Sequence, residues 1–253
     1  MNASIDLPYC GRPPAPEDLH LAWNMDWRLW LGLAVFAGAI VFVHRRKTFV
    51  LGWLALVVAF VSPLCALTVS LFAARSVHHM WLVVLAAPLL GIALPWLGKK
   101  IASAGSLIAL LVLLGLWHVP AIYSLAWSSH GIYWLLQAGL LLSATMFWSR
   151  IFHVLNDAHQ PVANELLGAL AQIAALVGFM GLIGAVLTFA PQVLFVEHGL
   201  APLFYGLEPL EDQQLAGLLM WVPGFVPLIG VAAYLAVREW KRAAVQRSEV
   251  AAP

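Results

Sequence analysis

Side chains that bind soft metals are concentrated in two neighbouring apolar segments of this 253-residue sequence. Cys65 lies in the first segment, and His78, His79 and Met80 lie a short distance further along the chain. His118 follows a later apolar segment. A thiolate, imidazoles and a thioether together suit Cu(I) better than any hard cation. Because carboxylates are scarce in the same zone, calcium and magnesium are not indicated.

The motifs of common metalloenzymes and hydrolases are absent from the sequence. It contains no CxxC pair, no HExxH and no repeated zinc-type spacing of ligands, so zinc is not indicated. It contains no serine–histidine–acid set and no nucleotide-binding loop, so no catalytic residue is assigned and we expect no enzyme. Cys10 lies in a polar tail and Cys65 in an apolar run, which leaves a disulfide open without indicating one.

The composition is that of a membrane protein. Of the residues, 62% are hydrophobic and 10% are charged, with a mean hydropathy of +0.89. A soluble domain carries about 25% charged residues, so the lipid bilayer is the expected surrounding of this chain. The formal net charge is +1, which provides no basic face to replace phosphate counterions and argues against nucleic acid as a partner.

The apolar residues fall into seven segments that are long enough, or nearly so, to cross a bilayer. A hydrocarbon core of roughly 30 Å needs about 20 residues of helix, and apolar runs without period-two alternation favour helices over barrel strands. The predicted fold class is therefore all-α, a polytopic bundle of seven transmembrane helices. The predicted spans are Trp27–Val43, Phe49–Ala73, His78–Leu97, Ile101–Trp117, Ile132–Phe152, Leu166–Phe189 and Leu215–Val237.

The basic residues orient these spans. Ten of the thirteen lysines and arginines lie in clusters that seven spans place on one side, and the positive-inside rule makes that side the cytoplasm. The N-terminus is then outside, with an outer tail over 1–26, a transmembrane domain over 27–240 and a cytoplasmic tail over 241–253. Six of the nine histidines and both cysteines fall outside or in the outer half. The basic residues concerned are Arg45, Arg46, Lys47, Lys99, Lys100, Arg150, Arg238, Lys241, Arg242 and Arg247.

Structural interpretations compete with metal binding at each candidate ligand. His118 follows the fourth span, where it can cap helix carbonyls, and Cys65 alone is more often a small buried residue than a ligand. His78 and His79 point about 100° apart on a helix, so one can face the bundle while the other meets the headgroups. Polar groups at membrane depth usually mark function, which favours a ligand role for the inward one.

Arg75 lies between the second and third predicted spans, on the side where basic residues are rare. Its guanidinium is expected either to reach the lipid headgroups or to pair with Asp212, Glu211 or Asp26. The acidic run Glu208–Asp212 leads into the seventh span, where carboxylates also favour a helix N-terminus electrostatically.

A set of dispersed motifs runs through nearly the whole chain. They are Tyr9-Cys10-Gly11 with Trp23-Asn24 and Asp26, Ser62-Pro63-Leu64-Cys65-Ala66-Leu67, Ala74-Arg75-Ser76-Val77-His78-His79-Met80, Ala86-Ala87-Pro88-Leu89-Leu90, Trp117-His118-Val119-Pro120, Leu187-Thr188-Phe189-Ala190-Pro191, and Pro209-Leu210-Glu211-Asp212-Gln213-Gln214 with Gly217 and Met220-Trp221-Val222-Pro223-Gly224. Together they resemble the multi-span CtaG family of cytochrome c oxidase assembly proteins. The resemblance implies a membrane assembly factor for haem–copper oxidase in a bacterial inner membrane. The partners it implies are oxidase subunits and a copper donor protein, with transiently bound Cu(I) as the cofactor.

The resemblance also implies which residues serve the metal. Candidate copper ligands are Cys65, His78, His79 and His118, and further site positions are Cys10, His198 and Asp212, to which Met80 is added for its thioether. Two alternatives remain open at this point. One is a haem-binding membrane protein in which His79 and His118 ligate the iron. The other is a metal-free scaffold for oxidase assembly.

Overall fold

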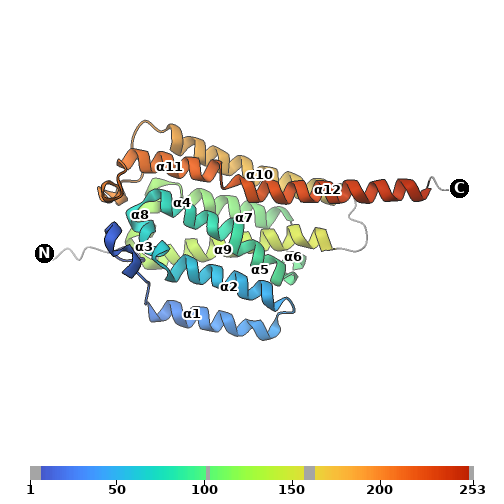
Figure 1. Cartoon of the computed structure of the whole chain (residues 1–253), viewed down its shortest axis with the longest axis horizontal. Helices are drawn as coiled ribbons and strands as arrows, with labels where there is room; N and C mark the ends of the chain where they lie inside the picture. Colours follow the sequence, from blue (N-terminus) through green and yellow to red (C-terminus); the bar gives the residue numbers. More distant parts are fainter. Residues whose placement is uncertain (1–6, 101–102, 157–162, 251–253) are drawn as a thin grey trace.

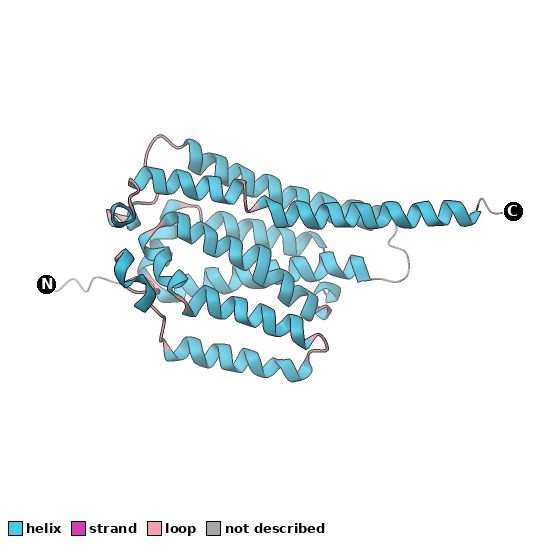
Figure 2. Cartoon of the chain, in the orientation of Figure 1, coloured by secondary structure: helices cyan, strands magenta, loops and turns pink. Residues whose placement is uncertain are grey.

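The chain folds into a bundle whose helices lie side by side along one long axis (Figure 1). A computed structural model describes residues 7–100, 103–156 and 163–250, and these residues form helices and connections without a strand (Figure 2). The helices are α1 (Trp27–Gly38), α2 (Arg46–Val61), α3 (Pro63–Ser70), α4 (Phe72–Trp81), α5 (Ala87–Ala93), α6 (Trp96–Lys100), α7 (Ser103–Leu116), α8 (Pro120–Ser128), α9 (His130–Asn156), α10 (Ala163–Phe189), α11 (Pro209–Trp221) and α12 (Phe225–Val250).

The described helices are long and apolar enough for a membrane protein. Four stretches qualify as spans by length and composition, and up to six qualify if each of two bent helix pairs counts as one, with the shorter apolar helix Trp27–Phe42 beside them. The all-helical class is confirmed, whereas seven spans and their orientation stay predictions. The four stretches are Phe72–Ala93, His130–His153, Glu165–Phe189 and Pro209–Lys241.

Prolines bend two of the helices near the same end of the bundle. A bend of 46° separates α2 from α3 at Pro63, and a bend of 80° separates α7 from α8, which begins at Pro120. Proline lacks the N–H for the intrahelical bond and clashes with the preceding turn. Pro88 does not break its helix, because a π-helical turn over Leu82–Ala86 precedes it and carries α4 into α5. The bends turn α3 and α8 across the end of the bundle (Figure 1).

The boundary between the second and third predicted spans was wrong by several residues. The bent pair α2–α3 ends at Ser70 and α4 begins at Phe72, so α4 starts well before His78. Leu71 alone joins them, in an extended conformation with φ −127° and ψ 130°. A one-residue break within a continuous apolar run leaves no trace in hydropathy. At the far end, α12 continues from the predicted span through Val250, and residues 251–253 lie outside the described residues.

The two ends of the bundle differ in what they contain. Residues 7–26, α3, α8 and the connection over 190–208 lie at one end, which we call the tail end (Figure 1). The turn between α1 and α2, α6, the end of α9 and the end of α12 lie at the other, which we call the basic end. The basic clusters of the sequence belong to these four segments, so the fold gathers them at one end.

Small residues let α10 and α11 approach closely. A Cβ added to Gly217 would meet the hydroxyl of Thr188, and it would lie 2.5 Å from the carbonyl oxygen of Gly184. A Cβ on Gly184 would in turn lie 2.9 Å from the carbonyl oxygen of Gly217. Such small-residue contacts are typical of helix packing in membranes. They hold α11 at the distance from which its first turn reaches α4.

Gly217→Ala is therefore expected to lower the free energy of unfolding by about 1–3 kcal/mol, the usual cost of overpacking. Thermal unfolding of the purified chain in detergent measures this loss. Gly178→Ala is the matched control, because a Cβ at Gly178 on α10 meets nothing within 4 Å. Equal melting temperatures for the two variants would contradict the close approach.

Candidate functional site

The face that α4 turns toward the bundle carries an arginine and two histidines. Arg75, His78 and His79 have the i, i+3, i+4 spacing of one helix face, and their exposed fractions are 3%, 0% and 1%. The expectation that one histidine would meet the headgroups is therefore wrong. Because α4 begins at Phe72, both histidines lie in its second and third turns and not at its start.

Asp212 of α11 caps the N-terminus of α4. Its Oδ2 accepts a hydrogen bond from the N–H of Phe72 at 2.6 Å, and its Oδ1 accepts one from the N–H of Ala73 at 3.0 Å. The first N–H groups of a helix have no intrahelical partner, and a carboxylate there also meets the positive end of the helix dipole. Asp212 is 1% exposed, so this cap is buried and its role is to position α4.

His78 has partners for both ring nitrogens. Its Nε2 lies 3.1 Å from the carbonyl oxygen of Ala59, and its Nδ1 lies 3.2 Å from the side-chain nitrogen of Gln137. A carbonyl oxygen only accepts, so the neutral ring carries its proton on Nε2 and accepts from Gln137 on Nδ1. His78 therefore ties α2 to α9, and neither nitrogen has a lone pair left for a metal.

His79 has the opposite environment. Neither of its ring nitrogens has a hydrogen-bond partner among the described residues, although the side chain is buried. Its ring lies 4.8 Å from the ring of Trp117 and 6.1 Å from the ring of His118, between centroids. A buried polar group without a partner indicates a ligand, an ion or a water.

His118 is held in the tautomer that a metal ligand needs. Its Nδ1 lies 2.8 Å from the carbonyl oxygen of Leu114, so Nδ1 carries the proton and Nε2 keeps the lone pair. This is the predicted capping of helix carbonyls. It is also the outer-shell hydrogen bond that metal-bound histidines usually make. His79 and His118 together thus offer two nitrogen donors to one small ion.

Arg75 pairs with no carboxylate among the described residues. Its guanidinium carbon lies 5.6 Å from the ring centroids of both Trp117 and Tyr133, and its Nε and Nη1 have no hydrogen-bond partner within the described part of the chain. Arg75 is 3% exposed, so the expected contact with lipid headgroups is wrong. The expected pairing with a carboxylate is also wrong, and Asp212 caps α4 instead. It is a buried cation held against aromatic rings, beside the histidines.

The two cysteines form a disulfide that joins the N-terminal tail to α3. The sulfurs of Cys10 and Cys65 are 2.04 Å apart. Asn24 donates to the Cys65 sulfur at 3.8 Å, and the hydroxyl groups of Thr68 and Tyr133 lie 3.9 and 3.8 Å from the Cys10 sulfur. In this oxidised form Cys65 is not the thiolate that a copper ligand requires. The predicted Cys65 ligand therefore applies only to the reduced protein.

His198 and Met80 contact other parts of the fold. The Nδ1 of His198 lies 3.1 Å from the carbonyl oxygen of Val69, and its Nε2 lies 2.8 Å from the hydroxyl of Tyr123. Both nitrogens are thus used to fasten the connection over 190–208 to α3 and α8. Met80 faces the break between α11 and α12, where a Cβ on Gly224 would lie 3.1 Å from its sulfur.

The fold therefore gathers only part of the predicted ligand set. Among the described residues, no three histidine, cysteine, aspartate or glutamate side chains lie close enough to hold a metal together. The neighbours that complete the buried cluster were missed from the sequence: Trp117, Tyr123 and Tyr133. The signal that could have found Tyr133 is its place on α9, one turn before Gln137, which the sequence marks as a rare polar residue within a span.

These features define a helical membrane protein with a buried cluster of histidines, an arginine and aromatic rings near the tail end. The profile of the cytochrome c oxidase caa3 assembly factor family (Caa3_CtaG) matches residues 27–242. The chain belongs to this family, and the resemblance noted in its motifs is confirmed. Comparisons with curated proteins and with solved structures find no match.

Asp212→Asn is expected to destabilise the chain, because it replaces one acceptor oxygen of the α4 cap by an N–H₂ donor. The expected loss is about 1–3 kcal/mol, the cost of leaving a buried group unsatisfied. Hydrogen exchange should also become faster at the amides of Phe72 and Ala73. Asp18→Asn, on the exposed side of the tail, is the control. An unchanged exchange rate at both amides would contradict the capping role.

His198 is expected to make the stability of the chain depend on pH. Burial, and then the positive charge of Arg75, lower the pKa of His198 to about 3, whereas in the unfolded chain it is about 6.5. Between these values the unfolded state binds more protons, so stability is complete above about pH 6.5 and falls as the pH falls toward 3. Melting temperatures from pH 7.5 to 4.5 measure the slope.

His198→Gln removes this titration and should flatten that slope. His20→Gln, on the exposed tail, is the matched control and should keep the slope of the original chain. If both variants have the same pH dependence, His198 does not carry the effect.

Proposed function

We propose that this chain assists the assembly of cytochrome c oxidase by binding Cu(I) transiently at His79 and His118 and passing it to an oxidase subunit in the membrane. The observation that carries the proposal is the buried imidazole of His79, whose two nitrogens lack hydrogen-bond partners among the described residues. Beside it lies the imidazole of His118, whose Nδ1 donates to a helix carbonyl so that Nε2 keeps its lone pair. Family membership supplies the process that such a site would serve.

The topology we propose has seven spans, with the tail end outside and the basic end in the cytoplasm of a bacterial plasma membrane. Two independent features support it. The disulfide between Cys10 and Cys65 lies at the tail end, and disulfides persist in oxidising compartments outside the cytoplasm. The lysine and arginine clusters belong to the opposite end, as the positive-inside rule requires for a cytoplasmic face. The site then lies toward the outer leaflet.

Copper chemistry fits the pair of histidines. Imidazole is a good ligand for copper, and soft Cu(I) is bound with low coordination number by few donors. Bonds between a metal and an imidazole nitrogen are roughly 2.0–2.1 Å long, so one ion can reach a nitrogen from each of two rings whose centroids are 6.1 Å apart. Both rings must be neutral to bind, so the affinity should fall at acid pH.

Arg75 opposes tight binding of any cation. Its guanidinium contacts the same Trp117 ring that packs on His79, and two positive charges repel more strongly in a medium of low dielectric constant than in water. A carrier has to release its metal, so weak binding suits delivery to an oxidase subunit. Reduction of the disulfide by a dithiol protein would add the thiolates of Cys10 and Cys65 near the tail end.

Titration of the purified chain with Cu(I) against a chromophoric competitor tests the site. His79→Phe is expected to weaken binding by more than about tenfold, a change of about 1.4 kcal/mol, and His118→Phe should have the same effect. His78→Gln is the matched control next to His79, because His78 already uses both nitrogens in hydrogen bonds. It should leave the Cu(I) affinity within about twofold.

Three results would reject the copper site. The first is that the original chain binds no Cu(I). The second is that the His78 and His79 variants lose Cu(I) affinity equally. The third is that the purified chain has a Soret band, which is lost when His79 and His118 are replaced. The last would favour haem in place of copper. If His79→Phe supports full oxidase activity in cells while binding no copper, the chain acts as a metal-free scaffold.

A further inference from the structure

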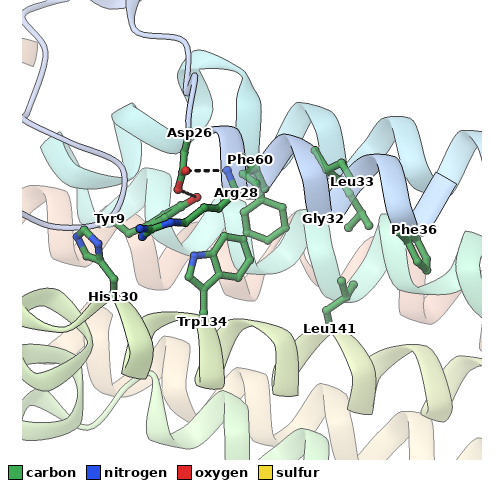
Figure 3. A pocket seen from close by; sticks show the side chains of 12 residues that line it. Tyr9, Asp26, Arg28, Gly32, Leu33, Phe36, Phe60, His130, Trp134 and Leu141 are labelled. Atoms are coloured by element: carbon green, nitrogen blue, oxygen red, sulfur yellow. Dashed lines mark hydrogen bonds between the residues drawn. The ribbon is translucent and has the colours of Figure 1, made fainter. Parts of the chain in front are cut away.

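A cavity of about 430 Å³ lies between α1, α2 and α9 (Figure 3). Its walls come from one face of each helix. Leu29, Leu33 and Phe36 line it from α1, Leu56 and Phe60 from α2, and Leu141 from α9. Their spacings of three, four or seven residues are those of single helix faces. The volume is within the range of small-molecule sites, roughly 300–1,000 Å³.

The cavity is apolar along its length and polar at one end. Tyr9, Asp26, Arg28 and His130 gather at that end, while Phe36 and Leu141 lie at the other (Figure 3). The polar end is the tail end of the bundle, because Tyr9 belongs to the tail and Asp26 precedes α1. The cavity is therefore amphipathic, and its polar mouth faces the same side of the membrane as the disulfide.

One cationic side chain at the mouth, Arg28, is available to an anion. The carboxylate of Asp26 is already engaged, since it accepts from the hydroxyl of Tyr9 at 3.0 Å and from the N–H of Arg28 at 2.9 Å. The guanidinium of Arg28 is exposed and lies 5.7 Å from the ring of Trp27, with no carboxylate within ion-pair distance in the described chain. Arg28 is therefore a cation without a carboxylate partner among the described residues. It lies at the polar end of the apolar part of the cavity, which we call the shaft.

The length of the shaft matches one leaflet of a bilayer. From Asp26 to Phe36 the backbone rises by about 15 Å at about 1.5 Å per residue, which is roughly half of a hydrocarbon core about 30 Å thick. Gly32 opens the side of the shaft, because it is exposed and a Cβ there would meet nothing within 4 Å. A chain lying in the surrounding leaflet can therefore enter sideways between α1 and α9.

We propose that this cavity, the α1 slot, binds one anionic glycerophospholipid, with an acyl chain between α1, α2 and α9 and its phosphate at Arg28. Because the leaflet is as apolar as the slot, the acyl chain is held there by van der Waals packing and not by removal from water, and the phosphate forms a charge-assisted contact with the guanidinium. The lipid completes the packing of α1, which is held to α2 by Leu29, Leu33 and the bond from Trp53 Nε1 to the carbonyl oxygen of Leu33 at 2.9 Å.

Native mass spectrometry of the full chain, delipidated in detergent and then titrated with phosphatidylglycerol or phosphatidylcholine of equal chain length, tests the slot. The original chain should retain one phosphatidylglycerol and prefer it by about tenfold, a difference of about 1.4 kcal/mol. Arg28→Gln should remove this preference while still binding both lipids. Gly32→Leu should fill the shaft and abolish retention of both.

Gly38→Leu is the matched control, because Gly38 ends the same helix, its Cβ meets nothing within 4 Å, and it does not line the slot. It should retain lipid as the original chain does. If Gly32→Leu fails to fold, crosslinking of the original chain with a photoactivatable acyl chain replaces it, and adducts should map to 29–36 and 134–141.

Several outcomes would overturn the proposal. Equal retention by the Gly32 and Gly38 variants, or crosslinks outside those two segments, would show that the acyl chain lies elsewhere. Equal affinity of the original chain for the two lipids would remove the role of Arg28. Melting temperatures raised equally by inorganic phosphate and by phosphatidylglycerol would indicate an anion site only. Retention of an isoprenoid quinone in place of a phospholipid would assign the slot to a different ligand class.

Discussion

The cap that Asp212 forms on α4 is the contact on which the buried cluster depends. It joins residues about 140 positions apart in the sequence and satisfies the N–H groups of Phe72 and Ala73. Because each helical residue turns by about 100°, the start of α4 decides which of its side chains face inward. Asp212 in turn reaches Phe72 because α11 packs closely on α10 through Gly184 and Gly217. Gly184 and Gly217 thus help to position the polar residues of α4, although they have no functional side chain themselves.

The cap also determines the electrostatics of the cluster. Asp212 is the carboxylate closest in the fold to the start of α4, and its oxygens are occupied by backbone N–H groups, so Arg75 is left to aromatic rings. A cation over a ring gains about 0.5–2 kcal/mol, less than the several kcal/mol that burial of an ion costs. The cluster therefore keeps uncompensated positive charge and unsatisfied donors. Buried groups left without partners are more often found at functional sites than at purely structural ones, which supports the proposed site.

Much of the fold was predictable from hydropathy, but the site was predictable only in part. The helical class and the segregation of basic residues follow from local composition, and His79 and His118 were among the predicted ligands. The start of α4 was not predictable, because the break at Leu71 lies in an apolar run and its cap comes from Asp212, far along the chain. The disulfide likewise joins Cys10 to Cys65, which are 55 residues apart. Sequence spacing does not report such distant pairings.

The adjacent histidines show why residue type alone could not separate structure from function. The described residues form two apolar cores, one that includes Ala59 and Phe60 on α2 and one that includes Leu136 and Leu140 on α9. His78 bridges them, since its nitrogens meet the carbonyl of Ala59 and the amide of Gln137. Successive helix residues point about 100° apart, so His79 faces Trp117 and His118 instead. One imidazole of the pair therefore joins two helices, and its neighbour has no hydrogen-bond partner among the described residues. Which of the two histidines joins the helices depends on a backbone carbonyl of another helix. No sequence motif encodes that contact.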